Sequence, residues 1–397
     1  MLSIQREIAF AAATLSSLTI ALFSVTTASA SPIAGVIAGV HGGGGCVWSA
    51  RTGRFTTLPG ARHPGAITIS PDGKRVIYFL PAKPDEDAGP YTGYTAASPF
   101  STASAIHGRR GSLTTADPPR IVWIGSGRAA LSAYQSQWSF DPARNRATAT
   151  PAPVESASDN GWIAYSTDFQ IHARNLATGD DRVLFDDRKP ARLLAELTQL
   201  PAKNRVQDLT DGYDAETAKS VENWVLSTAV TSHDGRSVYF LCNFGTGEGA
   251  QGNATMGFVQ ADVRTGRLRL LDRLGVVFGR TPDVFDLSPD GKSLLVASSV
   301  HDSAADNSYV VLDVDIAIGK SVNLLATDAA STEQANVVEG ACWSPDSCQI
   351  AVSVWYYDVD KAEEDSFNPR PNLEIKDAST GGTVAVVKDF SQPSWGR

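Results

Sequence analysis

Two cysteines, Cys342 and Cys348, flank a Ser-Pro-Asp-Ser segment in the stretch ACWSPDSCQIAV, residues 341–352. Paired thiols this close could bind a metal, exchange disulfides or form a structural disulfide. The C-x5-C spacing without a nearby histidine is poor evidence for zinc, and a catalytic dithiol more often has the spacing C-x-x-C. The pattern therefore favours a Cys342–Cys348 disulfide over free thiols, in an oxidising compartment. Cys46 and Cys242 lie in distant repeat units and are not expected to pair.

The other residue types that carry chemistry form no recognisable catalytic or cofactor motif. The HGGGG stretch at 41–45 resembles an esterase oxyanion loop, but that chemistry needs a G-x-S-x-G nucleophile, which the sequence lacks. The acidic run from Asp358 to Asp365 suggests calcium, yet it lacks the spacing and glycine of an EF-hand, which favours a solvated loop. The six histidines are scattered, and only His301 begins a loop where binding is expected. We predict no catalytic residue, no metal and no cofactor.

These residues belong to a repeat that runs along the chain. Ser232, Ser288 and Ser344 are spaced 56 residues apart, and each opens a turn between two alternating apolar runs. In a Ser-Pro-Asp-Gly turn, Pro presets the first turn position, Asp bonds its own backbone and Gly supplies a positive φ. Each unit is therefore predicted to be an antiparallel hairpin. The strong copies are at 67–79, 229–241, 285–297 and 342–354, with weaker copies at 122–134 and 156–168.

A second hairpin follows each of these inner hairpins, with outer turns such as NLATGDDRVL and DVRTGRLRLL. There are seven outer turns but only six inner ones. The missing inner hairpin falls at the chain ends, where Trp395 in SQPSWGR takes the place of Trp343 and SPIAGVIAGV supplies the second strand. We therefore predict an all-β fold, a seven-bladed β-propeller of four-stranded antiparallel blades closed by pairing of the N- and C-terminal strands. Six or eight blades are the alternatives.

The Ser-Pro-Asp-Gly-Lys hairpins resemble the WD40-like (PD40-type) propeller repeats of the TolB family, and also the propeller domain of prolyl oligopeptidase and its relatives. The resemblance covers most of the chain after residue 30 and implies fold more than function. TolB carries an α/β domain before its propeller, for which residues 31–65 leave no room, and the peptidases carry a hydrolase domain without a counterpart here. The resemblance thus implies a single propeller domain at 31–397.

Long insertions are expected on one face of this propeller, because the turns of the other face are short. They fall at 80–100, 242–256, 300–308 and 355–372, with a longer link at 186–223 that has helical spacing near its start. Function tends to lie on long loops held by a rigid scaffold. We therefore predict that this face binds an envelope protein or a small ligand. The predicted binding residues are Tyr91, Tyr94, Phe244, His301, Trp355, Tyr356, Tyr357 and Asp358.

The N-terminal sequence predicts export. Residues 1–30 have a short polar start, an apolar stretch and an Ala28-Ser29-Ala30 end, which is the pattern of a cleaved signal peptide. No later stretch is long and apolar enough to cross a membrane. The net charge of −9, without basic clusters, argues against nucleic acid and anionic membranes as partners. We expect a periplasmic or secreted protein.

Two functions remain open from the sequence. The first is a binding or scaffolding module that resembles TolB in its repeats. The second is an exported hydrolase or lyase whose site is built from innermost-strand residues that converge on the channel. Thr68 and Asp286 are expected to lie near that channel.

Overall fold

The computed structural model of the protein describes residues 33–83, 89–125, 127–133, 136–150, 153–167, 170–186, 229–246, 253–274, 284–302, 306–317, 320–324, 334–358 and 370–396. The chain divides into Met1–Pro32 and Ile33–Arg397, and everything below concerns the second unit. The predicted signal peptide at 1–30 and, apart from Asp186 at the end of a strand, the predicted helical insertion at about 186–223 lie outside the described residues. Every regular element in the described ranges is a β-strand, so none of them holds a helix that could span a membrane.

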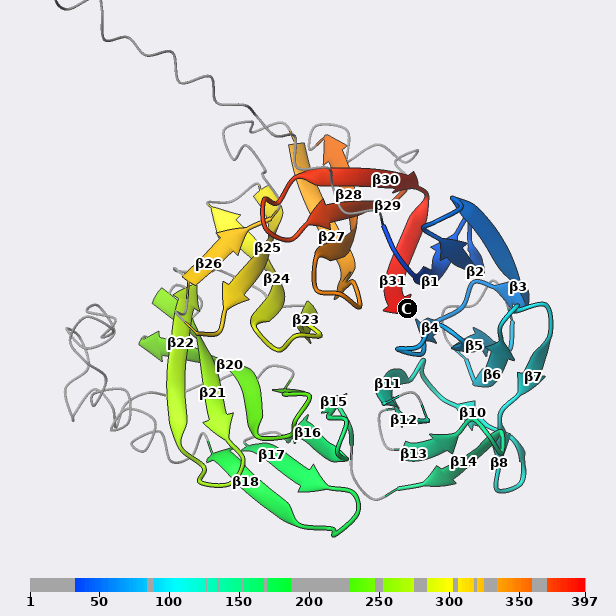
Figure 1. Ribbon diagram of the computed structural model, residues 1–397, viewed down its shortest axis with the longest axis horizontal. Helices are drawn as coiled ribbons and strands as arrows, with labels where there is room; N and C mark the ends of the chain where they lie inside the picture. Colours follow the sequence, from blue (N-terminus) through cyan, green and yellow to red (C-terminus); the bar gives the residue numbers. More distant parts are fainter. Residues whose placement is uncertain are drawn as a thin grey trace, which may run out of the picture. The chain divides into compact units, whose positions relative to one another are not determined.

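The described strands form seven sheets that follow one another along the chain (Figure 1). The first four sheets take the following strands. The first has the order β3-β2-β1-β31, with β1 Val36–His41, β2 Gly44–Ser49, β3 Arg54–Arg62 and β31 Phe390–Gly396. The second has β4 Ala66–Ile69, β5 Arg75–Pro81, β6 Tyr91–Ala97, β7 Ala103–Ala105 and β10 Thr114–Thr115. The third has β11 Arg120–Ile124, β12 Arg128–Ala133, β13 Ser136–Asp141, β14 Arg146–Ala149, β8 His107–Gly108 and β9 Gly111–Ser112. The fourth has β15 Ser156–Ala157, β16 Trp162–Ser166, β17 Gln170–Asn175 and β18 Asp181–Asp186.

The last three sheets have four strands each, in chain order, and they contain the longest strands of the described part, β20, β21, β24, β25, β27 and β28. The fifth has β19 Val230–Thr231, β20 Ser237–Thr246, β21 Asn253–Asp262 and β22 Leu268–Leu274. The sixth has β23 Val284–Leu287, β24 Ser293–Asp302, β25 Asp306–Asp315 and β26 Lys320–Asn323. The seventh has β27 Gln334–Trp343, β28 Gln349–Asp358, β29 Asn372–Asp377 and β30 Thr383–Lys388.

The Ser-x-Asp turns form as their sequence predicts. In the first turn the Ser70 hydroxyl donates to Asp72 Oδ1 at 2.6 Å and accepts the backbone N–H of Arg75 at 3.0 Å, while Gly73 takes a φ of +68°. The same Ser-to-Asp or Ser-to-Asn bond closes four further turns at 2.6–2.8 Å. Side chains thus fix each turn locally, and the turn sets the strand register. These turns are Ser158–Asn160, Ser232–Asp234, Ser288–Asp290 and Ser344–Asp346.

Strand β31 pairs with β1 in antiparallel register, so the two ends of the described unit share one sheet. Ile37 lies opposite Trp395, and Ala38 opposite Ser394. The register then shifts, because two residues of β31, Gln392 and Pro393, lie opposite the single residue Gly39. This β-bulge redirects the side chains next to it.

The hydrophobic core lies between successive sheets. Alternate residues of β5 point to opposite faces, so that Val76 and Tyr78 pack toward the first sheet while Ile77 and Phe79 pack toward the third. Buried clusters repeat this contact between each successive pair of sheets in the described residues, including the seventh and the first. The innermost strands also contact one another in the order β4, β11, β15, β19, β23, β27, β31 and back to β4. The architecture is therefore all-β and propeller-like.

The predicted Cys342–Cys348 disulfide is wrong for this structure, in which Cys46, Cys342 and Cys348 are free. Cys342 lies opposite Ala351 in the β27–β28 ladder. Cys348 precedes Ala351 by three residues, which is about 10 Å of strand and beyond the ~7 Å that separates bridged Cα atoms. The thiol of Cys348 is exposed, whereas Cys342 packs partly buried against Trp395 and its neighbours.

We expect the three described thiols to alkylate in a fixed order. Iodoacetamide should label Cys348 in the folded protein, because that thiol is exposed. Burial raises the pKa of Cys46 to about 12 and also raises the pKa of Cys342, so both should react only after denaturation. Peptide mapping reads each cysteine separately. A Cys342–Cys348 peptide pair that is lighter by two hydrogens and resists alkylation would contradict this structure.

Candidate functional site

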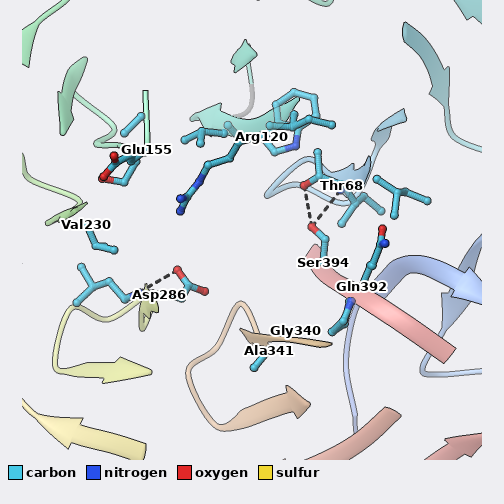
Figure 2. Close-up of a pocket in the computed structure, with 18 of the residues that line it drawn as sticks. Thr68, Arg120, Glu155, Val230, Asp286, Gly340, Ala341, Gln392 and Ser394 are labelled. Atoms are coloured by element: carbon cyan, nitrogen blue, oxygen red, sulfur yellow. Dashed lines mark hydrogen bonds between the residues drawn. The ribbon is translucent and has the colours of Figure 1, made fainter. Parts of the chain in front are cut away.

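A cavity of about 600 Å³ lies where the innermost strands meet, and each of the seven sheets contributes to its wall (Figure 2). Side chains of both charges, hydroxyls, an amide and branched apolar groups line it. Thr68 and Asp286, which are predicted from the repeat to lie near a channel, are both in this wall. The polar residues of the wall are Thr68, Arg120, Glu155, Ser156, Thr231, His233, Asp286, Gln392 and Ser394.

One repeat position of the innermost strands, here called the ring position, makes hydrogen bonds between neighbouring sheets. An innermost strand is the edge strand of its sheet. The backbone N–H groups on its unpaired side therefore need acceptors from outside that sheet. The hydroxyl of Ser394 accepts the backbone N–H of Ile69 at 3.1 Å, and the hydroxyl of Ser156 accepts that of Thr231 at 2.8 Å. In each case a side chain of one sheet satisfies the backbone of the next.

Asp286 and Cys342 occupy the same repeat position and play the same part. The backbone N–H of Trp343 faces Asp286 and acts to lower its pKa, and the backbone N–H of Trp395 does the same for Cys342. Val230, at this position in the fifth sheet, cannot accept a hydrogen bond, and Asp286 Oδ1 takes the backbone N–H of Leu287 instead, at 2.9 Å. The position that suggested thiol chemistry therefore joins successive sheets.

Three charged side chains face one another on one side of the cavity. Figure 2 shows the Arg120 guanidinium reaching toward the space between Glu155 and Asp286. Both carboxylates favour its charge, while enclosure by the walls lowers its pKa even though water in the cavity reaches the side chain. An arginine with a lowered pKa still carries its charge at any ordinary pH. This wall therefore presents a permanent cation beside two carboxyl groups.

The two carboxyl groups differ in what holds them. Glu155 accepts the Ser166 hydroxyl and the Ser166 N–H at 3.0 Å on Oε1, and the Ala229 N–H at 2.6 Å on Oε2. Those bonds tie the fourth sheet to the fifth. Asp286 is half-buried, and burial raises its pKa although the N–H of Leu287, His233, the N–H of Trp343 and Arg120 each oppose the rise. Glu155 is thus held in place by three donors, whereas burial favours the protonated form of Asp286 relative to an ordinary carboxyl group.

The opposite side of the cavity is polar but neutral (Figure 2). Thr68 Oγ1 and Ser394 Oγ are hydrogen-bonded at 2.8 Å. Gln392 lies at the β31 bulge and takes a φ of +51°, in the left-handed region that glutamine seldom adopts. A second register shift lies in β27 next to Gly340, which also lines the cavity. Irregular backbone therefore lies on two neighbouring strands of one wall, a placement typical of binding sites.

The aromatic residues predicted as binding anchors lie on strands and not on loops. Tyr91 is buried at 6% exposure and belongs to the core between the second and third sheets, and Tyr94 stacks on Tyr78 with ring centroids 5.6 Å apart. Trp355 is half-buried on β28. The described residues of the predicted loops 242–256 and 300–308 are extended strand, as are residues 355–358 and 372 of the predicted loop 355–372. The side chains of Phe244, His301, Tyr357 and Asp358, and the acidic residues after Asp358, lie outside what the structure describes.

Tyr356 is 43% exposed, but its hydroxyl has an internal partner. It donates to Glu374 Oε1 at 3.1 Å, and Lys376 Nζ lies 2.7 Å from Glu374 Oε2. The ion pair is nearly enclosed, with side-chain exposures of 8% for Lys376 and 12% for Glu374. Burial, with Glu374 beside it, raises the pKa of the Tyr356 phenol. The ring face of Tyr356 is therefore available to a partner, while its hydroxyl is hydrogen-bonded to Glu374 in the same sheet.

Of the eight predicted binding residues, the four whose side chains the structure describes, Tyr91, Tyr94, Trp355 and Tyr356, do not line the cavity. Arg120, Glu155 and Gln392, which do line it, carry no motif and stand in the degenerate repeats or at the C-terminal strand. The feature of the sequence that could have identified them is their position in the repeat. Arg120 and Gln392 lie two residues before the ring position of their sheets, so alignment of the innermost strands would have placed both on the channel side.

No protein-family model matches this chain, and no curated protein matches it. Solved propeller folds to which it is similar include apo AztD from Citrobacter koseri, at 12% identity and a TM-score of 0.47, covering 91% of this chain and 96% of that chain. Tricorn protease is similar at 14% identity and a TM-score of 0.34, and the match covers 88% of this chain but only 28% of the protease chain. A functionally unknown protein from Desulfotomaculum acetoxidans has 11% identity, a TM-score of 0.48 and coverage of 91% and 99%. These likenesses carry no argument about activity, and the resemblance to TolB repeats stays a prediction.

Proposed function

We propose that this chain is an exported, seven-bladed β-propeller, closed by the β1–β31 pair, that acts as a binding protein and holds a small polar ligand in the cavity at the innermost strands. The supporting observation is that every sheet contributes residues to one cavity of about 600 Å³. Binding sites for small molecules typically have volumes of about 300–1,000 Å³. The export part of the proposal rests on the sequence of residues 1–30 alone.

The lining supports binding of a polar molecule. Apolar groups such as Ile67, Val230 and Leu287 exclude water from part of the wall, while a few polar groups set orientation. Charged groups that are already held in place need no rearrangement to meet a ligand, which lowers the entropy cost of binding. Arg120 faces the cavity from β11 of the third sheet and Asp286 from β23 of the sixth, so their spacing is fixed by the scaffold.

A second candidate function is catalysis in the same cavity, as a hydrolase or lyase. The observation that favours it is the half-buried Asp286, whose pKa is raised beside a permanent arginine charge. A carboxyl group of this kind suits general acid catalysis, and the guanidinium would stabilise a developing anion. Turnover of a bound compound by the wild-type protein, lost in Asp286→Asn, would favour this function over simple binding.

Filling the cavity tests the proposed function. An added Cβ on Gly340 meets only ordinary contacts, the nearest being Pro393 Cδ at 3.4 Å, so a side chain there can project toward the cavity. Gly340→Trp should therefore abolish binding of compounds identified by thermal shift from a panel of small acids, amines, amino acids and sugars. Circular dichroism and the melting temperature check that the variant folds. Binding that survives in folded Gly340→Trp would place the site elsewhere and overturn the proposal.

A further inference from the structure

Resting on the proposed function, we propose that the cavity ligand is a free polar α-amino acid. Its ammonium and carboxylate groups would lie against Asp286 and Arg120, and its side chain would reach Thr68, Ser394 and Gln392 on the opposite wall. The inference deepens the proposed site by naming the chemical class that the wall complements.

The charged wall favours a zwitterion over an ion of one sign. Arg120 attracts a carboxylate, but the same carboxylate meets the negative charges of Asp286 and Glu155. A lone ammonium group has the reverse conflict, because Asp286 attracts it and Arg120 repels it. An α-amino acid offers both charges on one carbon and leaves the net charge of the cavity unchanged. Attraction and repulsion between charges are both stronger where less water surrounds them. The preference for a zwitterion over an ion of one sign therefore increases as the cavity becomes more enclosed.

Each charged group keeps the capacity to bind such a ligand. A guanidinium has five N–H donors, so Arg120 can hold a ligand carboxylate while it keeps its other contacts. A carboxylate has about four lone-pair sites, and the two backbone N–H groups on Asp286 leave room for an ammonium group. Glu155, by contrast, has three protein donors on its two oxygens and serves as a fixed charge rather than as a ligand contact.

The neutral wall indicates a polar side chain on the ligand. Gln392 is exposed to the cavity and is held there by a bulge and a left-handed backbone. A strained backbone persists only where the surrounding structure compensates for it, and such positions gather at binding sites. The Gln392 amide offers donors and an acceptor, and the Thr68–Ser394 hydroxyl pair lies on the same side. This set can satisfy a hydroxyl or an amide, whereas a purely apolar side chain would leave it without a partner.

Three matched probes separate the classes by isothermal titration calorimetry of the full chain. L-serine carries both charges, ethanolamine lacks the carboxylate, and 3-hydroxypropionate lacks the amine. L-serine, L-asparagine or L-glutamine should bind at least about tenfold more tightly than either single-charge analogue, since a hydrogen-bonded charge pair is lost in each analogue. Ethanolamine or 3-hydroxypropionate binding as tightly as the amino acids would overturn the inference.

Two substitutions test whether Arg120 and Asp286 contact the amino acid. Arg120→Gln and Asp286→Asn should each weaken amino-acid binding at least about tenfold. The exposed pairs Arg144–Asp141 and Arg182–Asp180 supply the controls, and Arg144→Gln and Asp180→Asn should bind like the wild type. Gln392→Ala should remove the preference for polar side chains more than it weakens glycine binding. Equal binding by folded Arg120→Gln and wild type would contradict the proposed contact.

The outcomes also distinguish this inference from the proposed function. A different class of compound that binds the wild type and is lost in Gly340→Trp leaves the cavity site standing and overturns only the amino-acid assignment. Amino-acid binding that persists in folded Gly340→Trp overturns both, because the ligand would then lie outside the cavity.

Discussion

Replacing Phe390 with alanine is expected to lower the free energy of unfolding by about 3–5 kcal/mol, as for a fully buried phenylalanine. Its ring has 0% exposure and packs in the cluster that joins the seventh sheet to the first, with Ile37, Trp395 and Leu373. The ring also occupies the space that a Cβ on Gly39 would need, so β31 and β1 approach closely here. Phe390→Ala therefore leaves a cavity at the place where the two ends of the described unit pair. Urea unfolding followed by tryptophan fluorescence measures the effect.

Phe55 supplies a matched control for this prediction. It lies on β3 of the same sheet, stacks on His41 with centroids 4.2 Å apart, and is 38% exposed. Phe55→Ala removes the same atoms from a partly solvated position, so it should cost about 1 kcal/mol or less. A loss for Phe390→Ala no larger than that for Phe55→Ala would show that the β1–β31 contact contributes little to stability.

Replacing Glu155 with alanine is expected to cost about 2–4 kcal/mol, because hydrogen bonds to a charged group contribute more than neutral ones and their donors are left unpaired. The variant removes the acceptor for the N–H groups of Ser166 and Ala229 and for the Ser166 hydroxyl. Those donors belong to two sheets, so both the fourth sheet and its contact with the fifth should loosen. Water entering from the cavity would satisfy some of them, which keeps the expected loss below the sum of three separate bonds.

Two comparisons make this prediction specific. Glu155→Gln keeps one oxygen but turns an NH₂ group toward a backbone donor, so it should recover only part of the loss. Asp180→Ala removes an exposed carboxylate that pairs with Arg182 at 2.6 Å and should change stability by less than about 1 kcal/mol. Hydrogen exchange of the Ala229 amide reports the contact directly. Unchanged protection of that amide in Glu155→Ala would contradict the proposed role.

The turns and the alternation of the strands could be predicted from the sequence because both are local. Ser70 and Asp72 bond each other and their own backbone, so the turn forms in any context that allows a hairpin. The disulfide prediction failed although the repeat alignment behind it was sound. Cys342 and Asp286 do hold equivalent positions, but their side chains meet the backbone of the next sheet and not the far strand of their own hairpin.

The binding residues were predicted from loop length and aromatic type, and neither signal locates a cavity. Tyr91 packs in the core, Tyr94 stacks on Tyr78, and the hydroxyl of Tyr356 is hydrogen-bonded to Glu374. Arg120 and Gln392 gave no signal in residue type, because an isolated arginine or glutamine in a strand is ordinary, and only their position in the repeat pointed to the channel. Their importance depends on what faces them from other sheets.

The sequence by itself determined the repeat, the hairpins and the alternation that puts apolar residues between sheets, because these follow from hydrogen bonds and side-chain periods within short stretches. Only the tertiary structure decided which polar residues meet. Arg120, Glu155 and Asp286 are far apart in the chain and come together because each lies on, or directly beside, an innermost strand of a different sheet. A charge acquires a partner, a shifted pKa or a ligand only through that convergence, since electrostatic interactions depend on distance in space and on the surrounding dielectric rather than on sequence separation.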